Sequence, residues 1–533
     1  MADDEPWRVD VRFAATVPVV RRNELLVLVR SIVLSVVVGD DLADDQPAGT
    51  AALITVGGLR CGPDDVHRVA DAARHWLRTM PGTGQQRVAM RTPHRGAVWW
   101  IEPTGALPAQ NVPPVLRSRS EAAARERTTI LVLADEWLPL RGGLSALNRY
   151  LCIALVHAGA QVYCAVPAFS IDEVADAASS GVNLVTAPQT TDAGEAPRSR
   201  PELPDGVVPD AVVGHGRITG PMAVSQVHDH FRTAVRLHIV HSEPDEVAWH
   251  KLDPDEDVGR TAEERTAAEL ALCAGARVIA VGPRLHQWLD RDLRNVNGVP
   301  PLRLDPGFGT YGQATRDPLP GIPQVLILGR MGDHMVKGLD IAARAVGHAV
   351  ELRGPAAGSV DLLIRGAYEH QGADLRAVIR RMINQPTVRV LPRNYSVDFE
   401  RIRQDLTRAS LMLMPSRAEG FGLVGLEAIV LGVPALVSDR SGLGMLLREV
   451  LPRELVHQIV VPVEDDAERD TAVWGHAVAA ILRNRRAAFD TAAAVMAIMA
   501  RERTWAMAAD VVLTAIRPTR SANVAWPSGG GVR

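Results

Sequence analysis

From Thr128 onward, short apolar runs alternate with longer amphipathic segments, and this alternation constrains the fold more than any other feature of the chain. A strand followed by a helix, repeated many times, predicts a parallel sheet with helices on its faces. The runs are apolar throughout, which is typical of strands buried on both faces. The pattern therefore predicts an α/β architecture for most of the 533 residues.

The alternation falls into two series, and the second begins at Pro323. Each series predicts a Rossmann-like parallel-sheet domain, and the two would join near residues 300–320 and face a deep cleft, with ligands outside the carboxyl ends of the strands. Leu144–Ala158 is a predicted helix that ends at Gly159. The predicted strands are Thr129–Ala134, Val162–Val166, Ala211–Val213, Leu237–Val240 and Val278–Val281 in the first series, and Val325–Leu328, Asp361–Ile364, Val388–Leu391, Leu411–Met414, Ala435–Val437 and Ile459–Val461 in the second.

The segment before Thr128 differs in texture and predicts a small α+β domain with no catalytic constellation. Its predicted strands are Val9–Thr16, Ala51–Val56 and a hairpin of Arg87–Met90 with Ala97–Ile101, and its predicted helices are Arg22–Val38 and Asp64–Thr79. The domain boundaries that follow are 1–102 for this adaptor-like domain, 103–127 for a Pro-rich linker, 128–315 and 316–503 for the Rossmann-like domains, 504–517 for a helix returning to the first half, and 518–533 for a disordered tail.

Composition excludes several classes of function. The formal net charge is -4 and only 4% of residues are aromatic, so neither an electrostatic nor a stacking surface for nucleic acid is predicted. Four cysteines form no CxxC pair and are interpreted as reduced core residues. The amino terminus is acidic, unlike a signal peptide, and Leu25–Val38 is interrupted by Arg30 and too short to span a bilayer. We therefore expect a cytoplasmic protein without a transmembrane segment.

Lysine occurs only at Lys251 and Lys337, so nearly every basic residue is arginine. Such a bias indicates a GC-rich genome, in which arginine codons are abundant. A lysine that persists under this pressure is a candidate for a specific role.

The strongest local motif runs from Glu419 to Glu427 and reads Glu-Gly-Phe-Gly-Leu-Val-Gly-Leu-Glu. It follows a predicted strand and opens a helix, where glycines allow backbone N–H groups to approach a ligand and the helix N-terminus favours an anion. The two carboxylates are suited to accept hydrogen bonds from sugar hydroxyls. From spacing alone, a capping carboxylate and an ordinary glutamate on the helix surface are the simpler interpretation.

This motif resembles the Glu-x7-Glu signature of the retaining GT-B glycosyltransferases of family 4. The resemblance covers roughly residues 128–516 and implies the GT-B fold, two Rossmann-like domains facing a cleft. It further implies that Glu427 holds the ribose of a nucleotide-diphospho-sugar donor and that Glu419, as a catalytic residue, holds the transferred sugar. The amides and side chains of the turn between them would complete the donor site: Gly420, Phe421, Gly422, Leu423 and Val424.

Three further elements match the family. Gly329-Arg330 and Lys337-Gly338 resemble its Gly-Arg and Lys-Gly elements, whose cations hold the donor diphosphate without a metal. Gly142-Gly143 resembles its Gly-Gly loop, whose amides face the donor phosphates, although a plain tight turn is the alternative. His215 lies where the family often has the active-site histidine that contacts the transferred sugar, and His241 corresponds to another common histidine.

The sequence also departs from the family. Residues 441–445 lack a glutamate that many relatives carry near this point, and Asp305-Pro-Gly307 replaces the usual Pro-Asn-Gly turn. Asp253-Pro-Asp255 and Asp255-Glu-Asp257 have the spacing of a metal-binding Asp-x-Asp, but they lie in a charged polar run and are interpreted as solvated surface. No Cys/His set of the zinc type is present, so we expect no metal and no cofactor.

The leading hypothesis is a retaining, metal-independent glycosyltransferase of bacterial type that moves a hexosyl group from a nucleotide-diphospho-sugar to an unknown acceptor. The alternative is a sugar-nucleotide-binding sensor or scaffold that recruits a protein partner through residues 1–102, a segment that faintly resembles adaptor domains of bacterial conflict systems. A GT-B epimerase is a third hypothesis, and it accounts less well for Glu419 and Glu427 together with Arg330 and Lys337.

Overall fold

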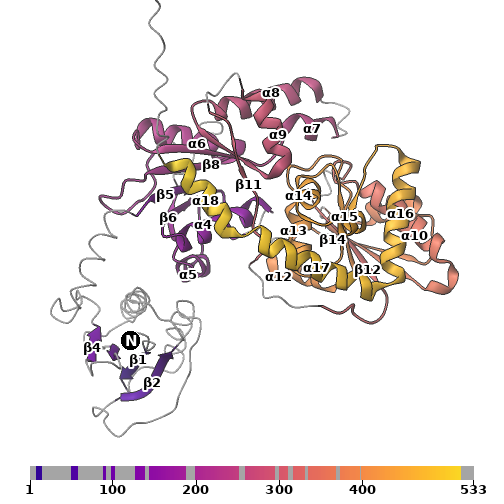
Figure 1. The fold of residues 1–533 in the computed structure, drawn as a ribbon, viewed down its shortest axis with the longest axis horizontal. Coiled ribbons are helices and arrows are strands. Elements are labelled where there is room, and N and C mark those ends of the chain that lie inside the picture. The colour runs from indigo at the N-terminus through magenta and orange to yellow at the C-terminus, as the bar shows by residue number, and fades with distance from the viewer. Residues whose placement is uncertain are drawn as a thin grey trace, which may run out of the picture. The chain divides into compact units, whose positions relative to one another are not determined.

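The computed structural model describes residues 8–14, 50–57, 88–91, 98–101, 127–138, 143–187, 199–250, 258–294, 299–309, 316–329, 334–367, 372–396 and 398–517. Contacts divide the chain into two compact units (Figure 1). The first consists of Met1–Arg127 with Ala178–Ser180, and the second consists of Thr128–Ala177 with Gly181–Arg533.

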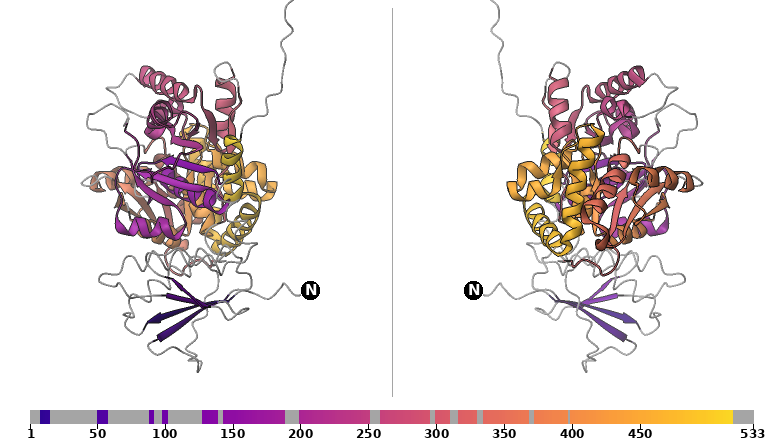
Figure 2. Two further views of the ribbon diagram at one scale, coloured as in Figure 1. Left: turned by 90° about the vertical axis from the view of Figure 1, so that its left-hand side faces the viewer. Right: turned by 90° about the vertical axis from the view of Figure 1, so that its right-hand side faces the viewer.

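The first unit contains a four-stranded antiparallel sheet in the order β2-β1-β3-β4 (Figure 2). Its strands are β1 (Arg8–Ala14), β2 (Thr50–Gly57), β3 (Val88–Arg91) and β4 (Val98–Ile101). The predicted hairpin is confirmed, because β3 pairs directly with β4 and places Met90 opposite Trp99. The predicted helices of residues 22–38 and 64–79 lie outside the described residues, as do most of the 103–127 linker and the 518–533 tail.

The first half of the second unit is a seven-stranded parallel sheet in the order β11-β10-β9-β8-β5-β6-β7. All five predicted strands are present, and their side chains are almost entirely buried, as expected for strands covered on both faces. The elements are β5 (Thr129–Leu133), α4 (Gly143–His157), β6 (Gln161–Val166), α5 (Ile171–Ser179), β7 (Asn183–Thr186), β8 (Ala211–His215), α6 (Gly216–Asp229), β9 (Val235–Val240), α7 (Pro244–Trp249), α8 (Val258–Cys273), β10 (Arg277–Val281), α9 (Gly282–Asp292) and β11 (Leu302–Leu304).

The second half is a six-stranded parallel sheet in the order β14-β13-β12-β15-β16-β17. Its six strands are those predicted, with β13 and β14 longer than expected. The elements are β12 (Gln324–Leu328), α10 (Leu339–Arg353), a 3-10 turn (Pro355–Ala357), β13 (Val360–Ala367), α11 (Gly372–Ile383), β14 (Val388–Asn394), α12 (Phe399–Arg408), β15 (Leu411–Met414), α13 (Leu423–Val430), β16 (Ala435–Ser438), α14 (Gly442–Val450), α15 (Arg453–Ile459), β17 (Val460–Val461), α16 (Ala467–Arg483), α17 (Arg485–Glu502) and α18 (Trp505–Ile516).

Two short strands were not predicted. β7 has only four residues, and β11 lies in the segment expected to join the two halves. Both are edge strands of the first sheet. An edge strand pairs with one neighbour only, so a short segment can form it. Runs of three or four residues carry too little periodicity to be recognised.

The last helix crosses back from the second half to the first. α17 belongs to the second half, and α18 packs against α4 and β11 (Figure 1). The backbone N–H of Phe308 donates to Arg503 O at 3.0 Å, and Arg277 Nε donates to Ala515 O at 3.3 Å. The two halves are thus joined by two separate passages of the chain. None of the helices in the described part is long and apolar enough to cross a membrane.

Candidate active site

The turn after β15 carries the strongest sequence motif and is shaped by its glycines. Gly422, the residue before α13, has φ 108°, and a Cβ there would lie 2.6 Å from Met414 Cε. Only glycine adopts this backbone conformation without strain. The glycine therefore permits the close turn by which the chain passes from β15 into α13.

Lys337 and Glu419 meet at this edge, although 82 residues separate them. Lys337 Nζ donates to Glu419 Oε2 at 2.6 Å, and the two side chains are 25% and 16% exposed. The contact follows from the sheet order, because β12 and β15 are neighbours and their following loops lie side by side. Gly329, from the predicted Gly-Arg element, packs against the aliphatic part of Lys337. A Cβ on Gly329 would lie 3.3 Å from Lys337 Cγ.

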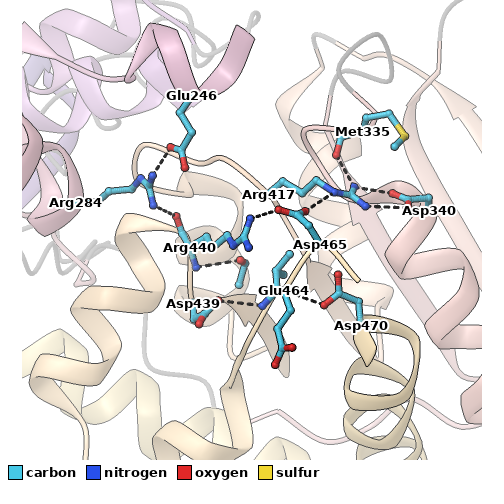
Figure 3. A network of polar contacts seen from close by, with 12 residues as sticks. Glu246, Arg284, Met335, Asp340, Arg417, Asp439, Arg440, Glu464, Asp465 and Asp470 are labelled. Carbon is cyan, nitrogen blue, oxygen red and sulfur yellow. Dashed lines mark hydrogen bonds and ion pairs between the residues drawn. The ribbon is translucent and has the colours of Figure 1, made fainter. Parts of the chain in front are cut away.

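A second contact holds these two loops in register, and the sequence analysis missed it. The Arg417 guanidinium donates to both carboxylate oxygens of Asp340, at 2.8 and 3.0 Å, and to Met335 O at 2.8 Å (Figure 3). Its backbone N–H donates to Val336 O at 2.9 Å. Asp340 is only 4% exposed, and two hydrogen bonds join its carboxylate to the Arg417 guanidinium. This buried bidentate pair fixes the position of Lys337 relative to Glu419. The available signal was a carboxylate in the first turn of α10 and an arginine two residues before Glu419.

Glu427 lies on α13 apart from this ion pair. It lines a largely apolar cavity together with Leu147 and Tyr150 of α4, Leu423 of α13, and Trp505 of α18. Burial raises the pKa of the Glu427 carboxyl to about 7. Leu423, the first residue of α13, lies between the two glutamates in the sequence and contacts the first half. A Cβ on Gly143 would lie 2.7 Å from Leu423 Cδ1.

The predicted histidine His215 is the last residue of β8, and its side chain is 0% exposed. Its backbone N–H donates to Thr219 Oγ1 at 2.8 Å, and its ring contacts Asn148 Oδ1 through Nε2 and His241 Nε2 through Nδ1, both at 3.0 Å. His215 therefore presents no exposed atom for the sugar contact that the resemblance implies. His241, which corresponds to the other common histidine of the family, is half-buried and follows the neighbouring strand β9.

The partners of these histidines determine their tautomers. Asn148 Oδ1 only accepts hydrogen bonds, so His215 Nε2 carries a proton and His215 Nδ1 accepts from the Nε2–H of His241. Burial lowers the pKa of His215 to about 3 and that of His241 well below its ordinary value, and repulsion between the neighbouring histidines adds to the effect. Both rings are neutral, and His241 Nδ1 retains a lone pair.

The donor motif and His241 come from opposite halves and are in direct contact. A Cβ on Gly420 would lie 2.2 Å from His241 O, and a Cβ on Gly282, which begins α9, would lie 2.5 Å from Phe421 Cδ2. Arg284 of α9 forms an ion pair with Glu246 and donates to Arg440 O of the second half at 2.6 Å (Figure 3). The structure therefore brings Lys337, Glu419, Gly420 and His241 together at one junction between the halves.

Two predicted site residues, Gly142 and Arg330, lie outside the described residues, as do the Asp-x-Asp segments at residues 253–257. In the part of the chain that the structure describes, no three His, Cys, Asp or Glu side chains are placed to hold a metal ion. Among the described residues, Cys152, Cys164 and Cys273 are buried thiols that form no disulfide bond.

The chain shows similarity to known glycosyltransferases. It is 29% identical over 204 residues to D-inositol 3-phosphate glycosyltransferase of Nocardia farcinica, a match that covers 37% of this chain and 41% of that protein. Sucrose-phosphate synthase from Thermosynechococcus elongatus is similar in structure, with 19% identity, a TM-score of 0.49, and coverage of 73% of this chain and 98% of that one. For the catalytic domain of starch synthase IV from Arabidopsis thaliana, bound to ADP and acarbose, the identity is 13%, the TM-score 0.49, and the coverage 73% and 99%.

One family profile matches most of the chain. It is described as family 4 glycosyltransferase in conflict systems, and the match spans residues 131–512, from β5 into α18. This range contains both parallel sheets and the junction between them. The chain therefore belongs to the family 4 glycosyltransferases of conflict systems, and its two parallel-sheet domains have the GT-B fold.

Proposed function

We propose that this glycosyltransferase moves a hexosyl group from a nucleotide-diphospho-sugar to an acceptor hydroxyl, with retention and without a metal. The observation that carries the proposal is the contact between Lys337 and Glu419 at the junction where His241 meets Gly420. This junction at the carboxyl edge of the second sheet supports a site in which a cation, a carboxylate and the neutral imidazole of His241 surround the transferred sugar. The cytoplasm is the proposed location.

Each of these groups has a distinct chemical task. The departing nucleoside diphosphate gains negative charge, and the Lys337 ammonium stabilises it. Glu419 accepts hydrogen bonds from the hydroxyls of the transferred sugar. The lone pair on His241 Nδ1 accepts a hydrogen bond from a hydroxyl of the transferred sugar on the opposite wall, while His215 and Asn148 hold the ring in that tautomer. The leaving phosphate takes the acceptor proton on the same face of the sugar, so no enzyme nucleophile is needed.

Incubation of the full chain with a panel of UDP-, GDP- and ADP-sugars tests the proposal. Release of the nucleoside diphosphate from at least one donor, measured by chromatography, is the expected result. Absence of turnover across the panel, together with absence of binding in calorimetry, would contradict it. The sensor or scaffold alternative depends on residues 1–102 and stays a prediction.

His241 is expected to contribute strongly to the turnover rate. His241→Ala removes the hydrogen-bond acceptor that faces the sugar, and a loss of roughly 10²-fold in kcat is expected for one positioned general acid–base or hydrogen-bonding group. Donor dissociation constants should change little, because the ring lies in the other half. His457→Ala, which alters an exposed histidine of α15, is the matched control. Equal kcat in the two variants would remove His241 from the site.

Glu427 is expected to make donor binding depend on pH. With its pKa at about 7, the carboxyl is protonated at about pH 6 and ionised at about pH 8. Only the ionised form accepts hydrogen bonds on both oxygens, so a ribose should bind more tightly as the pH rises through 7. Calorimetric titration with the nucleoside diphosphate selected by the panel should show this increase in the wild type and a smaller one in Glu427→Gln.

The comparison with Glu427→Gln isolates the effect, because the phosphates of the nucleotide titrate in both proteins. Identical pH profiles would show that Glu427 does not contact the nucleotide. Stability provides a second measurement. The folded-state pKa lies above the ordinary value of 4.5, so the unfolded chain loses this proton first and stability falls as the pH rises from about 4.5 to 7. Glu427→Gln should reduce that fall.

A further inference from the structure

A cluster of arginines lies at the β14 end of the second sheet, on the adjacent strands β13 and β14. The register places Arg365 directly beside Arg393, with Ile364 beside Pro392 before them. Like charges at adjacent positions of two strands destabilise a sheet unless an anion lies between them. The sequence pattern thus concentrates positive charge at the carboxyl edge of this sheet, where ligands of open α/β folds bind.

One buried carboxylate partly neutralises the pair. Asp405 of α12 is 2% exposed, and it accepts from Arg365 Nε at 2.6 Å and from Arg393 Nη1 at 2.6 Å. Arg365 is itself 9% exposed and also donates to Asn394 O at 2.9 Å. Asp405 holds both guanidiniums in place, but it supplies one negative charge to two positive ones.

Helix α12 adds two more arginines on the same face. Arg401, Gln404, Asp405 and Arg408 follow one another at the three- and four-residue spacing of a single helix face. Together with Arg365, Arg393 and Asn394 they line a polar cavity of about 440 Å³. This volume is in the range of sites for small-molecule ligands.

The charge balance of the cavity is positive. Arg401 pairs with Asp398 at the rim, at 3.0 Å, whereas Arg408 forms no ion pair with any residue in the described ranges. The four guanidiniums that line the cavity are therefore accompanied by two carboxylates, Asp405 within it and Asp398 beside Arg401. Arg393, Arg401 and Arg408 are exposed, and most of their N–H donors have no partner among the described residues.

We propose that this cavity, lined by Arg365, Arg393, Arg401 and Arg408, binds the phosphate groups of a nucleotide-sized anion. The forked donors of arginine match phosphate geometry, and Asn394 and Gln404 supply amide groups for the rest of the ligand. The site shares no residue with the Lys337–Glu419 pair. The phosphate belongs either to a separate effector or to the donor nucleotide itself.

The test uses inorganic pyrophosphate as the probe, full-length protein and calorimetry at low ionic strength. The pocket variant is Arg401→Gln with Arg408→Gln, which alters exposed side chains and leaves the buried Arg365–Asp405 pair intact. The matched control is Arg376→Gln with Arg380→Gln on exposed positions of α11, which changes the net charge by the same amount. Circular dichroism and thermal midpoints verify that all three proteins are folded.

We expect the pocket variant to weaken pyrophosphate binding at least tenfold, while the control stays within twofold of the wild type. Equal pyrophosphate affinity in the pocket variant and the wild type would overturn the proposal. Equal losses of affinity in the pocket variant and the control variant, for pyrophosphate or for a short single-stranded RNA, would also overturn the proposal. Such losses indicate diffuse attraction of polyanions. Persistence of the pocket-dependent binding at saturating UDP identifies a separate effector, and competition by UDP shows that the cavity takes part in binding the donor nucleotide. Either outcome supports the anion site.

Discussion

Lys337→Ala is expected to reduce sugar transfer by roughly 10²–10³-fold, the loss that follows removal of one preorganised electrostatic contact. The ammonium lies 2.6 Å from Glu419 at the carboxyl edge of the second sheet, where the proposed reaction places the growing charge of the leaving diphosphate. A group matched to developing charge acts mainly in the transition state. The loss should therefore appear in kcat, measured by release of nucleoside diphosphate, and much less in donor affinity.

Two further substitutions separate charge from shape. Lys337→Met keeps most of the stem that packs on Gly329 and removes the charge, so it should lose as much activity as Lys337→Ala. Lys337→Arg should restore transfer only in part, because a forked guanidinium does not replace a compact ammonium in a tight loop. A near-wild-type kcat for Lys337→Met would exclude an electrostatic role. A near-wild-type kcat for Lys337→Arg would contradict only the requirement for lysine.

Gly420→Ala is expected to reduce transfer by roughly 10²-fold, because displacement of reacting groups by about 1 Å has an effect of this size. The new Cβ would lie 2.2 Å from His241 O and 3.3 Å from Leu285 Cδ1, both in the other half. The backbone carbonyl cannot rotate away as a flexible side chain would. The methyl group therefore separates the Glu419 turn from His241, which affects kcat more than donor binding to the second half.

The matched control is Gly309→Ala, whose Cβ would approach no atom of the described residues closer than Ala500 O at 3.9 Å. It should retain wild-type kcat. Small-angle scattering should report a more open second unit for Gly420→Ala and no change for Gly309→Ala. Wild-type turnover by Gly420→Ala would show that the contact between the halves is unimportant for the reaction.

Most of the fold could be predicted from periodicity. The eleven strands expected in the two parallel sheets are all present, because buried parallel strands are apolar along their whole length and need no distant information to be recognised. The same holds for α4, whose predicted stop, Gly159, has φ 93°. The short strands β7 and β11 were missed because pairing at a sheet edge, and no local pattern, decides them.

The candidate site divides in a similar way. The motif glycines and the Glu419–Glu427 spacing identified the turn after β15, and the scarcity of lysine directed attention to Lys337. The sequence did not distinguish the two histidines, although His215 was predicted as the active-site residue. Each follows or ends a strand, and only the depth of β8 in the sheet, between β5 and β9, leaves His215 without exposed surface.

The sequence by itself therefore determined the two parallel sheets, the motif turn and the family, since these depend on local apolar runs and on residues close together in the chain. Only the tertiary structure decided which side chains meet. The neighbouring positions of β12 and β15 bring Lys337 to Glu419, and the packing of the halves brings His241 to Gly420. The register of β13 and β14 places Arg365 beside Arg393. Strand order, register and docking depend on contacts between distant segments, and no window of the sequence contains them.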